Sequence, residues 1–269
     1  IMPRLVGSEM CIRDSGVAVF YEIDNGALDD YDMTLSGEFG SLKFNGSGTS
    51  SAVGAIDDVT PNAYEEAWDV LDTDGTSTSG SPLVIGGGGG TNMFIYTSPD
   101  FSGFTVTAAY QNDGGAAGVA DSYSDYAIAY SPEMVEGLTL GYGTGDKNIS
   151  ANVDQSNTTG YAKYAIGGFT LGYQVSESDH DTKTLSLDSV AYGVTYAVND
   201  DITVGYSYHE VDMDSARGTG TFTQESTGIS ASYTMGGMTL GGAINETDNM
   251  RGVDANDFES YEFNLSFAF

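Results

Sequence analysis

The sequence predicts an all-β protein, a transmembrane antiparallel β-barrel of the up-and-down type. Three observations predict it: segments that alternate between large apolar and small polar residues, connections that are alternately short and long, and a composition rich in Tyr and Gly.

The last segment shows the alternation most clearly. Residues 261–269 carry Tyr, Phe or Leu at every odd position and Glu, Asn, Ser or Ala at every even position, and the apolar row ends on the terminal Phe269. A soluble protein rarely leaves such a row at a free end, because an aromatic edge strand aggregates. A strand with one face in lipid and the other toward water needs this pattern.

The same period of two recurs in about fourteen segments, most of them long enough to cross a membrane as strands. The expected strands are 16–23, 31–38, 40–46, 91–98, 103–112, 122–131, 136–145, 158–166, 168–176, 187–198, 201–211, 224–235, 238–247 and 257–269. Their second face consists of small uncharged residues. A sandwich core needs large apolar residues there, whereas a water-filled lumen accepts small polar ones.

The connections indicate a meander with all long loops on one side. The short ones are 37–40, 100–103, 132–137, 167–168, 199–200 and 236–237. The long ones are 47–90, 112–121, 145–157, 177–186, 211–223 and 247–257. Outer-membrane barrels have short turns at one rim and long loops at the other.

Composition excludes several classes of protein. The 269 residues include 18 Tyr, 12 Phe, 37 Gly and 5 Pro, which is typical of strands and turns. The formal charge is −31, with only 8 Lys plus Arg, so nucleic acid is excluded as a partner. No apolar run is long enough for a transmembrane helix, which does not exclude a barrel. The single cysteine, Cys11, rules out a disulfide within the chain.

Residues 1–15 differ from the rest of the chain. They contain Cys11 and two of the eight basic residues, and they show no alternation. They lack the apolar core of a secretory signal and resemble translated sequencing-adapter read-through. We expect a non-native segment at 1–15, a barrel domain at 16–269 and a missing native N-terminus; a natural extension is the alternative.

Two motifs resemble the general porins of Gram-negative bacteria: Gly37–Asn45 (GEFGSLKFN), then a long loop, then Tyr96–Tyr110 (YTSPDFSGFTVTAAY). The resemblance implies a homotrimer of sixteen-stranded barrels, of which two N-terminal strands are missing here. It also implies an outer-membrane location, contact with lipid and lipopolysaccharide, and a loop 47–90 folded into the lumen. The acidic-proline-glycine motif of that loop is not visible.

The resemblance further implies passive diffusion of small hydrophilic solutes and recognition of the C-terminal strand by the barrel-assembly machinery. The residues that would carry this signal are Tyr261, Phe267 and Phe269.

The loop 47–90 is strongly acidic and contains no Lys or Arg. Its carboxylates are Asp57, Asp58, Glu65, Glu66, Asp69, Asp72 and Asp74. A ring of carboxylates in a narrow pore favours cations. Two other interpretations stay open: a solvated external loop, and weak association with Ca²⁺ or Mg²⁺, although no calcium-loop spacing is present. No cofactor and no specific metal site are expected.

Aromatic residues in the same loop are expected to hold it against the barrel wall. Pro61–Leu71 could form a short helix with Tyr64, Trp68 and Leu71 on one face. Only two cations, Lys43 and Lys163, fall on inward positions of predicted strands. The pore lining is therefore expected to be mostly acidic.

An enzyme is not expected. His180 and His209 have no nucleophile or metal-ligand partner at a useful spacing, and each is expected to be satisfied or exposed. The predicted function is a cation-preferring diffusion channel. The alternative is an acidic secreted or surface-layer β protein that binds cations or a partner.

Overall fold

The computed structural model describes residues 15–24, 27–46, 49–69, 82–90, 92–112, 122–150, 153–181, 186–214 and 223–268. Within these ranges, no helix is long and apolar enough to cross a membrane. The segment 1–15 lies outside them except for Ser15, so its interpretation as non-native stays a prediction.

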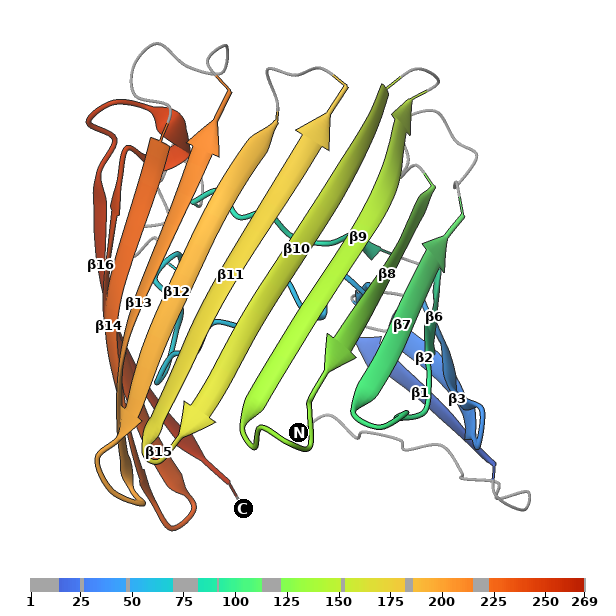
Figure 1. The fold of residues 1–269 in the computed structure, drawn as a ribbon, viewed down its shortest axis with the longest axis horizontal. Coiled ribbons are helices and arrows are strands. Elements are labelled where there is room, and N and C mark those ends of the chain that lie inside the picture. Colours follow the sequence, from blue (N-terminus) through green and yellow to red (C-terminus); the bar gives the residue numbers. More distant parts are fainter. Residues whose placement is uncertain are drawn as a thin grey trace. The chain divides into compact units, whose positions relative to one another are not determined.

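Fourteen antiparallel strands form one sheet, with chain order and sheet order the same (Figure 1). The strands are β1 (Gly16–Asp24), β2 (Ala27–Gly37), β3 (Gly40–Asn45), β6 (Met93–Thr97), β7 (Phe104–Gln111), β8 (Tyr123–Tyr130), β9 (Leu138–Ser150), β10 (Val153–Ile166), β11 (Phe169–His180), β12 (Leu187–Ala197), β13 (Ile202–Met213), β14 (Thr223–Met235), β15 (Met238–Asp248) and β16 (Phe258–Phe267). The part of the chain that connects β3 to β6 contains a separate two-stranded ribbon, β4 (Thr49–Ser50) with β5 (Gly89–Gly90). One 3-10 turn, η2 (Met250–Gly252), follows β15.

The predicted fold class is confirmed, since each of the fourteen expected segments is a strand of this sheet. One expected connection, 145–157, is wrong, and a second, 177–186, begins later than expected because β11 continues to His180. Strands β9 and β10 continue to Ser150 and from Val153, so 145–157 is mostly paired strand. The hydroxyls of Thr144 and Thr158, just before and just after this extension, lie 3.1 Å apart in a hydrogen bond. A sequence reading that stops a strand where apolar residues stop therefore ends it too early.

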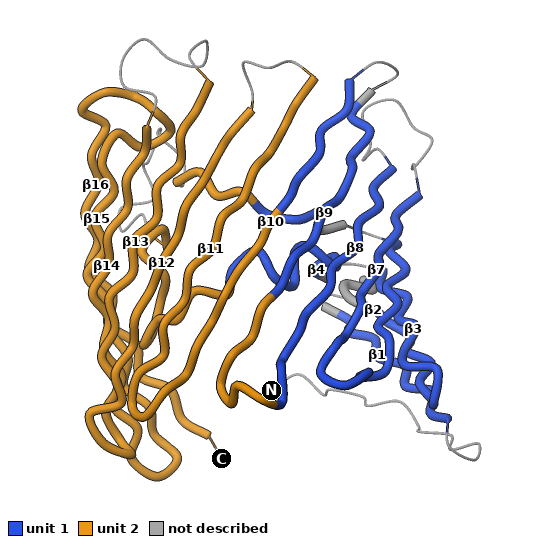
Figure 2. The backbone as a smooth tube through the Cα atoms, viewed as in Figure 1, with its two compact units in different colours: residues 1–58, 86–133, 141–158 blue, residues 59–85, 134–140, 159–269 orange. Residues whose placement is uncertain are grey.

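The chain divides into two compact units (Figure 2). Unit 1 comprises residues 1–58, 86–133 and 141–158, and unit 2 comprises residues 59–85, 134–140 and 159–269. The long connection between β3 and β6 therefore contributes its two ends to unit 1 and its middle to unit 2.

The two faces of the sheet differ sharply in chemistry. On β11, Leu171 and Tyr173 are 45% and 51% exposed, whereas Gln174 and Ser176 are 4% and 6% exposed. Large apolar side chains thus cover the open face, and polar side chains are buried. This is the reverse of a water-soluble sheet and fits a face in contact with lipid.

The polar face of unit 2 is buried because residues 59–69, hereafter the crossing segment, lie on it. Glycines occur where this segment passes strands β11 to β15: Gly172, Gly193, Gly205, Gly228 and Gly241. A Cβ at Gly193 would lie 2.4 Å from the carbonyl oxygen of Pro61, and one at Gly172 would lie 2.3 Å from its Cδ. These small residues were interpreted from the sequence as lining for water. In unit 2 the glycines make room for the backbone and side chains of the crossing segment.

We expect Gly193→Ala to destabilise the protein by about 1–3 kcal/mol, because the added methyl group overlaps the Pro61 carbonyl oxygen. Denaturant unfolding followed by circular dichroism would measure the change. Gly16→Ala is the matched control, since its Cβ would meet only the Ser36 hydroxyl at 3.3 Å, which can rotate away. Equal shifts in the two variants would contradict the close approach.

Candidate functional site

The beginning of the long loop is held by a buried carboxylate on β8. Asp125 is 3% exposed and accepts hydrogen bonds from the backbone N–H groups of Ala52 and Val53, at 3.1 and 2.7 Å. The Tyr123 hydroxyl donates a third bond at 2.9 Å. Three donors satisfy a charge that would otherwise be costly to bury. The sheet thus fixes the start of the loop through its backbone.

Asp57 joins the two ends of the loop. Its carboxylate accepts the N–H of Gly87 at 2.6 Å, and a Cβ at Gly86 would lie 2.7 Å from the same oxygen. Burial raises the pKa of Asp57, and its backbone hydrogen bonds partly offset this. Asp57 was predicted as a pore carboxylate; the geometry gives it a contact within the loop as well.

The crossing segment is attached to the strands of unit 2 in the same manner. The N–H of Val59 donates to Gln174 Oε1 on β11 at 3.3 Å, and the N–H of Ala63 donates to Ser230 Oγ on β14 at 3.0 Å. Backbone groups that have no partner within the loop therefore find one on the sheet.

The short helix expected at 61–71 is wrong for its described part, since residues 61–69 form turns and bends without a helix. The Asn245 side-chain amide, 1% exposed, donates to the carbonyl oxygens of Glu66 and Asp69, both at 2.8 Å. These carbonyls would serve helical bonds in an isolated peptide. In the folded protein the Asn245 side chain, which its strand holds in place, bonds to these carbonyl oxygens instead.

The aromatic residues of the crossing segment lie against strands. The Trp68 ring sits 4.6 Å from the His209 ring on β13, at an interplanar angle of 56°. The Tyr64 hydroxyl donates to Glu262 Oε1 on β16 at 2.5 Å. Leu71 falls outside the described residues.

His209 was expected to be satisfied or exposed; it is buried, and within the described ranges one of its two ring nitrogens is unsatisfied. Its exposed fraction is 2%, and among the described residues its Nδ1 has no hydrogen-bond partner. The ring contact with Trp68 covers it instead.

The return of the loop is held by Gln224 on β14, which is fully buried. Its Oε1 accepts the N–H groups of Leu83 at 2.9 Å and Arg251 at 3.1 Å, and its amide donates to the Leu83 carbonyl at 3.1 Å. A small apolar cluster accompanies it, formed by Ile85, Leu187, Val211 and Met213.

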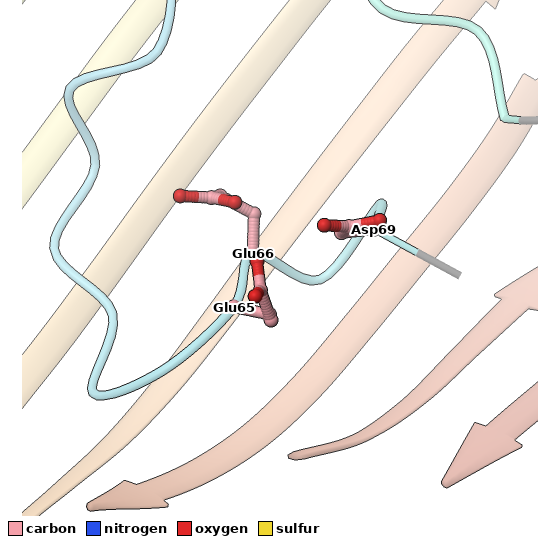
Figure 3. A group of neighbouring side chains, drawn as sticks. All are labelled: Glu65, Glu66 and Asp69. Atoms are coloured by element: carbon pink, nitrogen blue, oxygen red, sulfur yellow. The ribbon is translucent and has the colours of Figure 1, made fainter. Parts of the chain in front are cut away.

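Three of the predicted carboxylates form a compact group (Figure 3). One carboxylate oxygen from each of Glu65, Glu66 and Asp69, hereafter the acidic group, lies within 4.8 Å of the other two. Glu66 also accepts a hydrogen bond from the Asn62 amide at 2.6 Å. Burial, followed by the hydrogen bond and the charge of Asp69, raises the pKa of Glu65 to about 7. The acidic group therefore changes its charge near neutral pH.

The other predicted charges are dispersed. Asp58 is exposed, and Asp72 and Asp74 lie outside the described residues. Lys43 forms a salt bridge of 3.1 Å with Asp32 on β2, which offsets its charge. Lys163 lies four residues after the buried Thr159 on β10, and alternate residues of a strand share a face. Lys163 therefore belongs to the same polar face as Thr159.

Sequence reasoning missed the strand residues that hold the loop. They are Asp125, Gln174, Gln224, Ser230, Asn245 and Glu262. One signal was available: most of these side chains are larger than the Gly, Ser, Thr and Ala that fill the other inward positions. Their partners could not be found from local patterns.

The predicted C-terminal signal is partly visible. Tyr261 and Phe267 are 64% and 55% exposed on the apolar face of β16, whereas Phe269 lies outside the described residues. Their recognition by assembly machinery stays a prediction.

We expect Asp125→Ala to loosen the start of the loop, because it leaves the buried N–H groups of Ala52 and Val53 without acceptors, at a cost of roughly 2–4 kcal/mol. Limited proteolysis of the folded protein would detect new cleavage within 49–58. Ser124→Ala, at the exposed neighbouring position, is the control and should leave the digestion unchanged. Identical digestion of Asp125→Ala and wild type would refute the anchoring role.

Comparison with solved structures places this sheet among porins. The anion-selective porin of Comamonas acidovorans superposes with a TM-score of 0.69 and 15% identity, over 95% of this chain and 84% of that one. Salmonella typhi OmpF in complex with daunomycin gives 0.66 and 13% over 96% and 87%. Vibrio cholerae OmpT, folded in vitro and in trimer form, gives 0.56 and 14% over 93% and 87%. At these identities the likeness shows the fold.

A search of curated proteins found no match. A family model described as Gram-negative porin matches residues 14–252, which is most of the chain. The resemblance inferred from Gly37–Asn45 and Tyr96–Tyr110 is confirmed, and the alternative of a secreted or surface-layer protein is set aside. The chain belongs to the Gram-negative porin family, as a passive channel of the outer membrane and not an enzyme.

Proposed function

We propose that this porin is a diffusion channel for small hydrophilic solutes and ions that prefers cations, with residues 47–90 as its constriction loop. One observation carries the proposal: Glu65, Glu66 and Asp69 gather on a backbone that is attached to the sheet at several points. Fixed carboxylates in a narrow passage attract cations and repel anions. The net charge of −31 acts in the same direction.

The Comamonas acidovorans porin is anion-selective, yet it shares only 15% identity with this chain. Charge preference is set by individual side chains, so the fold does not carry it from one porin to another. The charge preference of this channel therefore depends on its own side chains. Lys43, a cation expected on the inward face, is paired with Asp32, which reduces its opposition to the field of the acidic group.

Two accompanying proposals concern partners. A homotrimer is supported by the trimer form of Vibrio cholerae OmpT. Lipid, lipopolysaccharide and the barrel-assembly machinery as partners are supported by the exposed apolar face that includes Tyr261 and Phe267. Any attraction of Ca²⁺ or Mg²⁺ belongs to the general cation preference, because only the spacing of the acidic group points to a metal.

The reversal potential across a planar lipid bilayer under a KCl gradient tests the proposal. We expect a cation-selective potential. Neutralising the acidic group with Glu65→Gln, Glu66→Gln and Asp69→Asn should lower the cation-to-anion permeability ratio by about two- to fivefold.

The matched control neutralises three exposed carboxylates in the short connections: Asp100, Glu133 and Glu136. Its reversal potential should equal that of the wild type. An anion-selective wild type, or an equal loss in the control, would reject the acidic group as the origin of the preference.

A second prediction concerns pH. The pKa of Glu65 is raised to about 7, so Glu65 is neutral below that pH and charged above it. Cation preference should therefore rise as the pH passes upward through about 7. The Glu65→Gln variant should lack this step and lose selectivity only near pH 4, where ordinary carboxylates titrate. A step near neutral pH that persists in the variant would assign it to another group.

A further inference from the structure

Strand pairing places a carboxylate of β16 at the level where the crossing segment is attached. Ser230 pairs with Ala243, and Ala243 pairs with Glu262, so the three residues form one row across β14, β15 and β16. Ser230 accepts the N–H of Ala63. The next loop residue, Tyr64, is therefore at the right level to reach Glu262.

The contact between Tyr64 and Glu262 requires a position on β15 that has no side chain, and Gly241 provides it. The Tyr64 ring lies over Gly241, where a Cβ would be 2.3 Å from Tyr64 Cδ2. The ring thus spans β15, and its hydroxyl donates to Glu262 Oε1 at 2.5 Å. Burial and this hydrogen bond both raise the pKa of Tyr64, which keeps the hydroxyl a donor.

Glu262 also acts on the acidic group. It is half-buried, so its charge is still directed partly to solvent. Besides burial and Asp69, the charge of Glu262 is among the causes that raise the pKa of Glu65. Two carboxylates that influence each other in this way also act together on a passing ion.

We propose that Glu262 is a selectivity residue of the channel, which adds a carboxylate from the sheet to the acidic group and positions it through Tyr64. The inference rests on the proposed cation preference and deepens it. The C-terminal strand then has two roles: its odd positions face outward, and Glu262 at an even position contributes to the field that ions cross.

The test is the reversal potential of purified Glu262→Gln in a planar bilayer under a KCl gradient. Gln keeps an acceptor for Tyr64 and removes the charge, so the cation-to-anion permeability ratio should fall about two- to fivefold. Glu259→Gln is a closely matched control. Glu259 lies on the same strand, on the opposite face, and also accepts a hydrogen bond from a tyrosine, Tyr261. Its ratio should stay that of the wild type.

Two further variants separate charge from structure. Glu262→Asp keeps the charge with a shorter reach and should retain most of the selectivity. Tyr64→Phe removes the hydroxyl and keeps every carboxylate, so it should increase current noise more than it lowers the ratio.

The failure of this inference is distinguishable from failure of the proposed function. A cation-selective wild type with an unchanged ratio in Glu262→Gln would overturn the role of Glu262 and leave the cation preference intact. A fall in Glu262→Asp as large as that in Glu262→Gln would also overturn it, because geometry rather than charge would then be responsible. A wild type without cation preference would instead reject the proposed function.

Discussion

The architecture depends on one constraint: a loop with little regular structure lies on a buried surface, and its backbone N–H and C=O groups need partners there. The sheet supplies them from a few large polar side chains, each buried and each bonded to loop backbone, as Asp125, Gln224 and Asn245 illustrate. Between these side chains the positions must be small, because main chain passes within van der Waals distance. Glycine at positions such as 193 follows from the same requirement as asparagine at 245.

Attachment through backbone leaves the side chains of the crossing segment available for another purpose. Glu65, Glu66 and Asp69 need not serve as anchors, since the strands bond to main-chain atoms of the same segment. The backbone that carries them is nevertheless held by those bonds, and the Asn62 amide also holds the Glu66 carboxylate. A fixed charge exerts a stronger and more directional field than one on a mobile loop, because no reorganisation weakens it. Asp57 differs, since it bonds to the loop itself.

The sequence predicted the strands well and the loop poorly, for a physical reason. Alternation is a local property, so fourteen strands could be located from neighbouring residues alone. The bonds that shape the crossing segment join Val59 to Gln174, Ala63 to Ser230, and Glu66 to Asn245, which are 115, 167 and 179 positions apart. No local pattern encodes such pairs. The helix expected at 61–71 satisfied propensity and periodicity, and tertiary hydrogen bonds overrode both. The burial of His209 could not be predicted for the same reason, since the residue that covers its ring, Trp68, is distant in the sequence.

The polar character of the face beneath the loop has a consequence for how this channel can change over evolutionary time. A conventional core loses stability when one of its layers is removed, because apolar surface becomes exposed to water. Here the side chains under the loop, such as Gln224 and Asn245, would be hydrated without difficulty if the loop were shortened. Most of the apolar surface lies on the opposite face and would be untouched; the exception is the small cluster of Leu187, Val211 and Met213 beneath Ile85. The length of the loop can therefore change with little effect on the stability of the sheet. Selection can alter the width of the passage in this way while the strands stay the same.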